Sequence, residues 1–162
     1  MTEISRGGWS IIHVDEAWAS SREEKSLLRE GIRRLLPEES AKIGRVLGML
    51  VGSCGARSVF LVGMAGQEMA SAGRIAESDR EAVCSLAASV MAATRSLAGL
   101  IGEETFQGVY HRGKVSSALI LPVGDEAILL LVLENQLREG WNSLEISRAT
   151  MVLRDLLETN EV

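Results

Sequence analysis

Residues 79–101, DREAVCSLAASVMAATRSLAGLI, form the longest stretch of the chain with helical periodicity. Apolar residues recur in it in alternating steps of three and four, which is the repeat of one helix face. This stripe consists of Val83, Leu86, Val90, Ala93, Leu97 and Leu100. Ser78 suits the N-cap, and Gly102 suits the position after the last turn. The stretch therefore predicts a long helix whose stripe packs on the core of its own domain.

A second face of the same helix is also apolar, and its residues are mostly small. Its members are Cys84, Ala87, Ala88, Met91 and Ala92, with Arg80 and Arg95 near its ends. A helix buried on all sides would explain this face, but a chain of 162 residues has few helices to bury so completely. Exposed apolar patches mark interaction sites. We therefore expect this face to contact a second copy of the chain or a partner protein.

The composition of the chain is that of a soluble globular domain, with 46% hydrophobic and 24% charged residues. The formal net charge of −5 argues against a general nucleic-acid binder, because phosphate contacts need clustered Lys and Arg. Cys54 and Cys84 are too few for a disulfide framework and lack metal-ligand spacing. The N-terminus does not resemble a signal peptide, and we expect no stretch of membrane-spanning length. These features predict a cytoplasmic protein.

The order of elements predicts an N-terminal extension followed by one domain. Residues 1–36 contain a short apolar segment with Trp9 and Trp18, then an amphipathic helix. Residues 37–162 form the domain. Its expected elements are a helix over 37–54, strands over 57–64 and 68–74, the long helix, strands over 104–112, 115–123 and 127–133, and a last helix after Asn142.

The apolar content of the strands predicts their order in a sheet. Residues 127–133, AILLLVL, have no polar alternation, which indicates a strand buried on both faces between helices. The strands at Val59 and Ile128 are the most apolar and are expected to be central, whereas those at Met69 and Phe106 are expected to be edges. The Phe106 strand has no proline or inward charge to protect its edge. We expect it to pair with another chain.

Three stretches resemble the roadblock (dynein light chain roadblock) family, and specifically its bacterial MglB-like branch. They are GARSVFLVGMAGQEMASAG at 55–73, SLAASVMAATRSLAGLIGEETFQGVYHRGKVSSALILPVG at 85–124, and DEAILLLVLEN at 125–135. The resemblance extends from about Pro37 to Glu158, and the family has no catalytic motif. One departure is the first hairpin turn, where Ala65 precedes the glycine in place of the family's frequent Asp or Asn.

The resemblance implies an α/β (α+β) fold with roadblock/profilin-like α/β/α layers. Its centre would be a five-stranded antiparallel sheet, with a long helix on one face and the terminal helices on the other. It also implies a homodimer, in which the long helices and edge strands of two copies pair into one continuous sheet. Members regulate or scaffold small Ras-like GTPases. In the MglB-like branch, a dimer binds the GTP-bound (MglA-like) GTPase and stimulates hydrolysis without a catalytic residue of its own.

Together, the helix faces, the edge strand and the resemblance give the expected interaction residues. The expected dimer interface consists of Cys84, Ala87, Ala88, Met91, Thr105, Phe106, Gln107, Val109 and His111. Arg80 and Arg95 are expected to face the GTPase, because arginine is enriched in contact surfaces. An arginine inserted into the GTPase active site is the less favoured reading, with Arg74 and Arg112 as its other candidates.

The sequence shows no pattern of an enzyme active site. The GxxxxGK[ST] motif of a nucleotide-binding loop is absent, and Ser116 and Ser117 lack a nucleophile-elbow pattern. His13 and His111 lie in different elements. We therefore expect no catalytic residue, no cofactor and no metal. Two alternatives to a GTPase activator remain: a roadblock dimer that only scaffolds a GTPase, and a small-molecule sensor domain with a polar-lined cavity.

Overall fold

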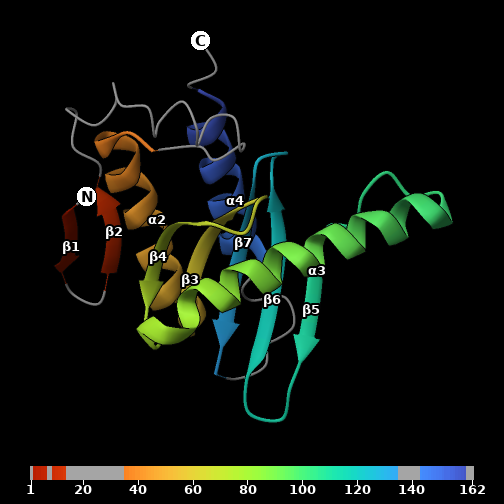
Figure 1. Ribbon diagram of the computed structural model, residues 1–162, viewed down its shortest axis with the longest axis horizontal. Coiled ribbons are helices and arrows are strands. Elements are labelled where there is room, and N and C mark those ends of the chain that lie inside the picture. The colour runs from red at the N-terminus through yellow and green to blue at the C-terminus, as the bar shows by residue number, and fades with distance from the viewer. Residues whose placement is uncertain (1, 7–8, 14–34, 135–142, 160–162) are drawn as a thin grey trace.

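The computed structural model describes residues 2–6, 9–13, 35–134 and 143–159 (Figure 1). The predicted helix before Pro37, together with Trp18 and Asn142, lies outside these residues. The elements in chain order are β1 Thr2–Arg6, β2 Trp9–His13, α2 Pro37–Cys54, β3 Ala56–Gly63, β4 Glu68–Gly73, the 3₁₀ turn η2 Glu77–Asp79, α3 Arg80–Ile101, β5 Val109–Arg112, β6 Ser117–Val123, β7 Ala127–Leu133 and α4 Ser143–Glu158.

The strands form one antiparallel sheet in the order β1-β2-β4-β3-β7-β6-β5. Its last five strands are the predicted five-stranded sheet, with β3 and β7 in the middle and β5 at the edge, as expected. The prediction that β4 is an edge is wrong, because β2 pairs with it through Trp9↔Ala72 and Ser10↔Ser71. The N-terminal residues thus cover the β4 backbone, which leaves β5 as the exposed edge of the five-stranded unit.

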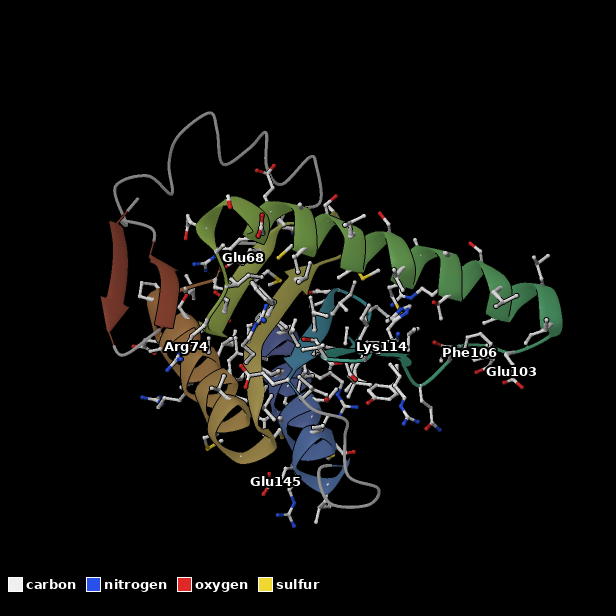
Figure 2. All side chains as sticks on the ribbon, turned by 90° about the horizontal axis from the view of Figure 1, so that it is seen from below. Glu68, Arg74, Glu103, Phe106, Lys114 and Glu145 are labelled. Carbon is white, nitrogen blue, oxygen red and sulfur yellow. The ribbon has the colours of Figure 1, made fainter. Side chains whose placement is uncertain are left out.

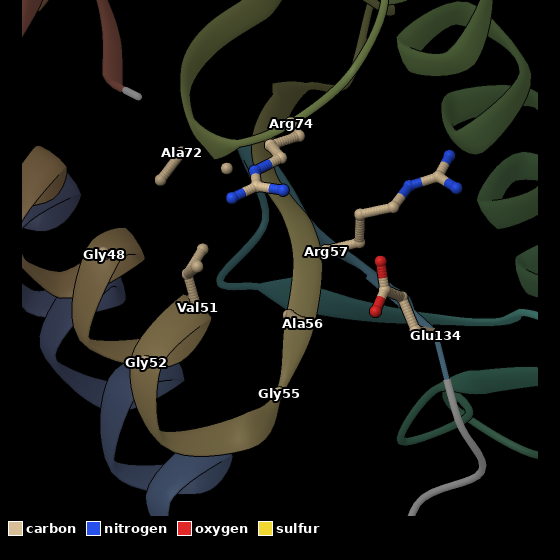
Figure 3. A pocket seen from close by; sticks show the side chains of 10 residues that line it. Gly48, Val51, Gly52, Gly55, Ala56, Arg57, Ala72, Arg74 and Glu134 are labelled. Atoms are coloured by element: carbon tan, nitrogen blue, oxygen red, sulfur yellow. The ribbon is translucent and has the colours of Figure 1, made fainter. Parts of the chain in front are cut away.

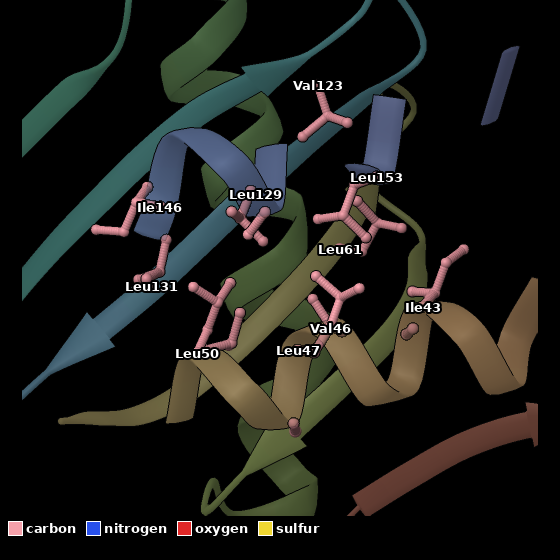
Figure 4. Close-up of a cluster of buried hydrophobic side chains, with 14 of the residues drawn as sticks. Ile43, Val46, Leu47, Leu50, Leu61, Val123, Leu129, Leu131, Ile146 and Leu153 are labelled. Carbon is pink, nitrogen blue, oxygen red and sulfur yellow. The ribbon is translucent and has the colours of Figure 1, made fainter. Parts of the chain in front are cut away.

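Helices α2 and α4 cover one face of the sheet and enclose the larger core (Figure 4). Helix α2 begins with Pro37, and the Glu39 carboxylate accepts a hydrogen bond of 2.7 Å from the Leu36 amide. It ends at Gly55, which has a left-handed φ of 65°. Side chains of both helices meet inward-facing residues of β3 and β7. Those labelled in Figure 4 include Ile43, Leu47, Leu50, Ile146 and Leu153 from the helices, and Leu61, Leu129 and Leu131 from the strands.

Of the long helices in the described residues, only α3 lies on the opposite face (Figure 1), so the predicted α/β/α layering is confirmed. The side of α3 that packs on the sheet carries Cys84, Ala87, Ala88 and Met91, all less than 9% exposed. The prediction that these four residues face another chain is therefore wrong. Small side chains let the helix approach closely. A Cβ on Gly66, in the β3–β4 turn, would lie only 3.1 Å from the Ser85 Cα.

Helix α3 is longer than its own sheet requires. Its 22 residues span about 33 Å at about 1.5 Å per residue, whereas five strands about 4.8 Å apart span only about 19 Å. The C-terminal part of α3 extends beyond β5 (Figure 1). Residues Glu77–Ile101 contain an 18-residue window with a mean hydropathy of 1.4, which meets the length and composition of a membrane-spanning helix, so our expectation that no stretch would do so is wrong. Only 28% of that window is buried, so most of it is uncovered in the single chain.

Candidate interaction surface of α3 and β5

The outward side of α3 carries large apolar side chains that the domain does not cover. Leu86 is 65% exposed, Leu97 52%, Leu100 85% and Ile101 61%. Leu86, Leu97 and Leu100 belong to the stripe that we predicted to pack on the core. The structure exchanges the two predicted faces, because the small-residue face packs on the sheet and this stripe is exposed. We call the exposed set Leu86, Leu97, Leu100 and Ile101 the α3 stripe. Leu97, Leu100 and Ile101 lie together in the last turns, and Leu86 lies about three turns earlier on the same side; an exposed apolar surface of this kind indicates an interaction site.

A sequence signal for this exposed side exists in the spacing of the apolar residues. From Val83 to Leu100 the steps are three, four, three, four and three, which is a seven-residue repeat. That repeat is typical of a seam between two helices, whereas a helix lying on a sheet has no such requirement. Val83 and Val90, at the inner border of the repeat, are half-buried against the sheet. We predicted that this repeat packs on the sheet, whereas the structure leaves Leu86, Leu97 and Leu100 exposed.

Strand β5 provides an open backbone edge beside this helix. Among the described strands, only β6 pairs with it, from Val109↔Ile120 to Arg112↔Ser117. Tyr110 is 41% exposed, and His111 is exposed as well. A strand at the edge of a sheet can accept another strand.

The predicted strand over 104–112 is shorter in the structure, since its first part is not a strand. Thr105 and Gln107 are exposed and Phe106 is half-buried in the segment that returns from the end of α3 to β5 (Figure 2). The Glu103 amide donates to the Ala98 carbonyl at 2.9 Å, which turns the chain back beneath the helix end. This segment pairs with none of the strands that the structure describes. Val109 and His111 remain the predicted interface residues that lie on the edge itself.

The guanidinium of Arg80 is bound within the domain. It donates to both carboxylate oxygens of Glu68, with an Nε–Oε2 distance of 3.0 Å, and also to the Ser71 hydroxyl. Glu77 accepts a further bond of 3.2 Å. The Arg80 and Glu68 side chains are only 14% and 12% exposed. The hydrogen bond with Glu68 is the main cause that raises the pKa of Arg80. Arg80 therefore fastens the start of α3 to β4 and is not displayed as a free contact residue.

Arg95 also differs from its expected place. It is half-buried and lies one turn after Met91 and one turn before Ala98, two residues that point toward the sheet side of α3. The outer surface of the helix instead presents small exposed residues, namely Ala82, Ser85, Ser89, Ala92 and Ser96. A partner that binds this surface would therefore meet serine side chains, and neither of the two predicted arginines lies there.

The buried thiol of Cys84 makes the stability of this helix–sheet contact depend on pH. Burial raises the pKa of Cys84 from 9.0 to about 12, and the charge of Glu68 adds to the shift. A raised pKa stabilises the fold fully below about pH 9 and loses that effect as the pH rises toward 12. We expect the urea midpoint of unfolding to fall over this pH range, and to fall less in Cys84→Ala.

Iodoacetamide should modify the native Cys84 thiol very slowly at pH 8. Rapid modification at Cys84, located by mass spectrometry, would contradict its burial.

A groove beside α2 is shown in Figure 3. It has a volume of about 590 Å³ and is lined largely by glycine, alanine and valine from α2, β3 and β4. Arg74 points toward Val51 and Ala72, whereas Arg57 and Glu134 lie on the other side of β3 in this view. These three charged residues are the polar side chains of the lining, and Arg74 lies apart from the other two in this view. Within the described ranges, no three His, Cys, Asp or Glu residues gather as metal ligands.

These layers define a class of protein: an α/β/α module that carries one long helix on one sheet face and two terminal helices on the other. The chain belongs to the Roadblock/LC7 family, whose domain model matches residues 42–133. This match lies within the predicted domain and excludes the N-terminal extension. No curated protein matches the chain.

Among solved structures, the chain is similar to MglB proteins, which places it in the MglB-like branch. Myxococcus xanthus MglB is 34% identical with a TM-score of 0.69, over 73% of this chain and 96% of that one. The gliding protein MglB from Thermus thermophilus is 27% identical with a TM-score of 0.70, over 78% and 96%. A structure described as MglB with tetrameric arrangement has the same identity and TM-score, over 78% and 95%.

Proposed function

We propose that this protein is a cytoplasmic homodimer that binds the GTP-bound form of a small Ras-like GTPase and stimulates its hydrolysis. The observation that carries this proposal is the exposed α3 stripe beside the open β5 edge. The MglB-like fold supports the choice of a GTPase as partner. The protein acts as a regulator, and the chemistry of hydrolysis belongs to the GTPase.

The dimer forms when two β5 edges pair about a two-fold axis perpendicular to the sheet. Both α3 helices then lie on the same face of one continuous sheet, and each protruding helix end covers the partner's half. The α3 stripes meet along this seam. Tyr110 and His111 lie beside it on β5. An interface of this kind buries on the order of 1,200–2,000 Å² in total, which is enough for a stable dimer.

The GTPase docks on the outer surface of the paired α3 helices. Ser85, Ser89 and Ser96 are exposed there. The Ser89 and Ser96 hydroxyls donate to the carbonyls of Ser85 and Ala92 at 3.0 Å, so that their oxygens face a partner as acceptors. Because the side chains on this surface are small, a partner can approach the helix backbone closely. Because Arg80 is bound to Glu68, stimulation here does not use an inserted Arg80. It instead biases the GTPase toward its active arrangement.

Single-turnover GTP hydrolysis by the Ras-like GTPase from the same cell tests this proposal. We expect the full-length protein to raise the rate at least about tenfold, and Arg95→Ala to keep most of that effect, since no inserted arginine supplies the rate. Binding is measured in parallel with a GTP analogue and with GDP. Binding without faster hydrolysis would leave only the scaffold alternative. Loss of nearly all stimulation in Arg95→Ala, with binding retained, would instead make Arg95 an inserted arginine.

A second level of assembly is also proposed. One MglB relative has a tetrameric arrangement, and we carry this to the present chain as a pair of dimers. The proposal requires a surface that the dimer leaves uncovered.

A further inference from the structure

Five large apolar side chains remain exposed on the side of the domain away from α3. They are Leu36 at 59%, Met49 at 65%, Leu144 at 59%, Met151 at 55% and Val152 at 46% exposure. All but Leu36 belong to α2 or α4. In Figure 2, Glu145 of α4 lies at the opposite extreme of the molecule from α3. Pairing through α3 and β5 leaves all five uncovered.

Part of this surface is a groove between α2 and α4. Its volume is about 520 Å³, and Met49 and Val152 stand at its exposed borders above Val46, Leu50 and Ala149. Its lining is almost entirely apolar. The two charged residues that line it are Glu145 and Arg148, which have opposite charges and lie one helical turn apart on α4.

We infer that this α2/α4 groove is the contact between two dimers, and that the same groove of a second copy occupies it. The inference rests on the proposed dimer. In that dimer, the two-fold axis places both α2/α4 layers on one face of the continuous sheet. When two dimers stack through these faces, each groove of one dimer contacts a groove of the other. Both contacts form together and give a closed tetramer.

Charge favours a second copy over an unrelated partner. In a two-fold contact, residue i of one copy meets residue j of the other, and residue j of the first meets residue i of the second. A surface with one positive and one negative group is therefore complementary to itself. With α4 antiparallel to its copy, Arg148 faces Glu145 of the other chain. The groove is thus locally neutral, although the whole chain carries −5. Met49 is a flexible side chain that fills an irregular apolar gap, and here it enters the opposite groove.

Sedimentation of the full-length protein over a wide concentration range tests this contact. We expect dimers at low concentration and tetramers at high concentration. Met49→Glu, Glu145→Arg and Arg148→Glu should each weaken the tetramer at least about tenfold. Combining Glu145→Arg with Arg148→Glu restores the complementary pair, and should return the tetramer constant to within about threefold of the original. Lys42→Glu changes an exposed α2 residue outside the groove and should have no effect.

The outcomes separate this inference from the proposed dimer. A protein that remains dimeric at every concentration overturns the groove contact and leaves the dimer intact. A tetramer that is insensitive to the groove substitutions, or one that the double charge reversal does not restore, also overturns it. A protein that remains monomeric removes the dimer, and with it the basis of the groove contact.

Discussion

Replacing Leu97 with Arg is expected to turn the dimer into a monomer. Leu97 lies within the exposed α3 stripe and is 52% exposed in the single chain, so the substitution does not disturb the core. In the dimer, the two-fold axis places two new charges in the same apolar seam. We expect a dissociation constant raised at least about a hundredfold, which corresponds to about 2.7 kcal/mol, measured by light scattering across a dilution series.

Ala92→Arg provides the matched control for this change. Ala92 is exposed on the other outward side of α3, so the same side chain is added without entering the seam. The dimer should persist in this variant, while GTPase binding should weaken because the docking surface is altered. A Leu97→Arg protein that stays dimeric at micromolar concentration, with unchanged circular dichroism, would show that the seam lies elsewhere.

Replacing Arg80 with Ala is expected to have the largest effect on stability. It leaves the Glu68 carboxylate, 12% exposed, without its partner beneath the start of α3. Removal of one partner from a buried ion pair costs about 3–5 kcal/mol, and the residual exposure here lowers our expectation to about 2–4 kcal/mol. For a chain of this size, that is a fall in Tm of roughly 4–16 °C.

The control variants separate the buried charge from the loss of a side chain. Arg154→Ala removes a 44% exposed arginine whose ion pairs are at the surface, and should change stability by less than about 0.5 kcal/mol. The double variant Glu68→Gln with Arg80→Ala removes the unpaired charge and should recover part of the loss. Equal stability of Arg80→Ala and the parent protein in urea unfolding would contradict the anchoring role.

The fold was predictable because its elements have strong local signals. The continuous apolar run at 127–133 became β7 with the same bounds, and the long helix differs by one residue at its start. Pro37 and Gly55 marked the ends of α2 as expected. The family resemblance predicted which helices lie on which face of the sheet. Hydrophobic periodicity alone does not predict that arrangement.

The interaction surface was only partly predictable, because periodicity shows that two helix faces are apolar but not which one meets the sheet. Close packing on a sheet favoured the small residues Ala87 and Ala88, while the larger leucines remained outside. Ala88→Arg would therefore disrupt the chain's own core. Arg80 pairs with Glu68, which lies twelve positions earlier in the sequence. No local sequence pattern predicts that these two side chains meet.

The molecular mass of the unmodified protein at low micromolar concentration tests the central claim most directly. In the proposed dimer a second chain covers the α3 stripe and the β5 edge, so sedimentation equilibrium should give about 35 kDa, twice the chain mass of 17.5 kDa. A mass that stays at 17.5 kDa up to several hundred micromolar would contradict the account.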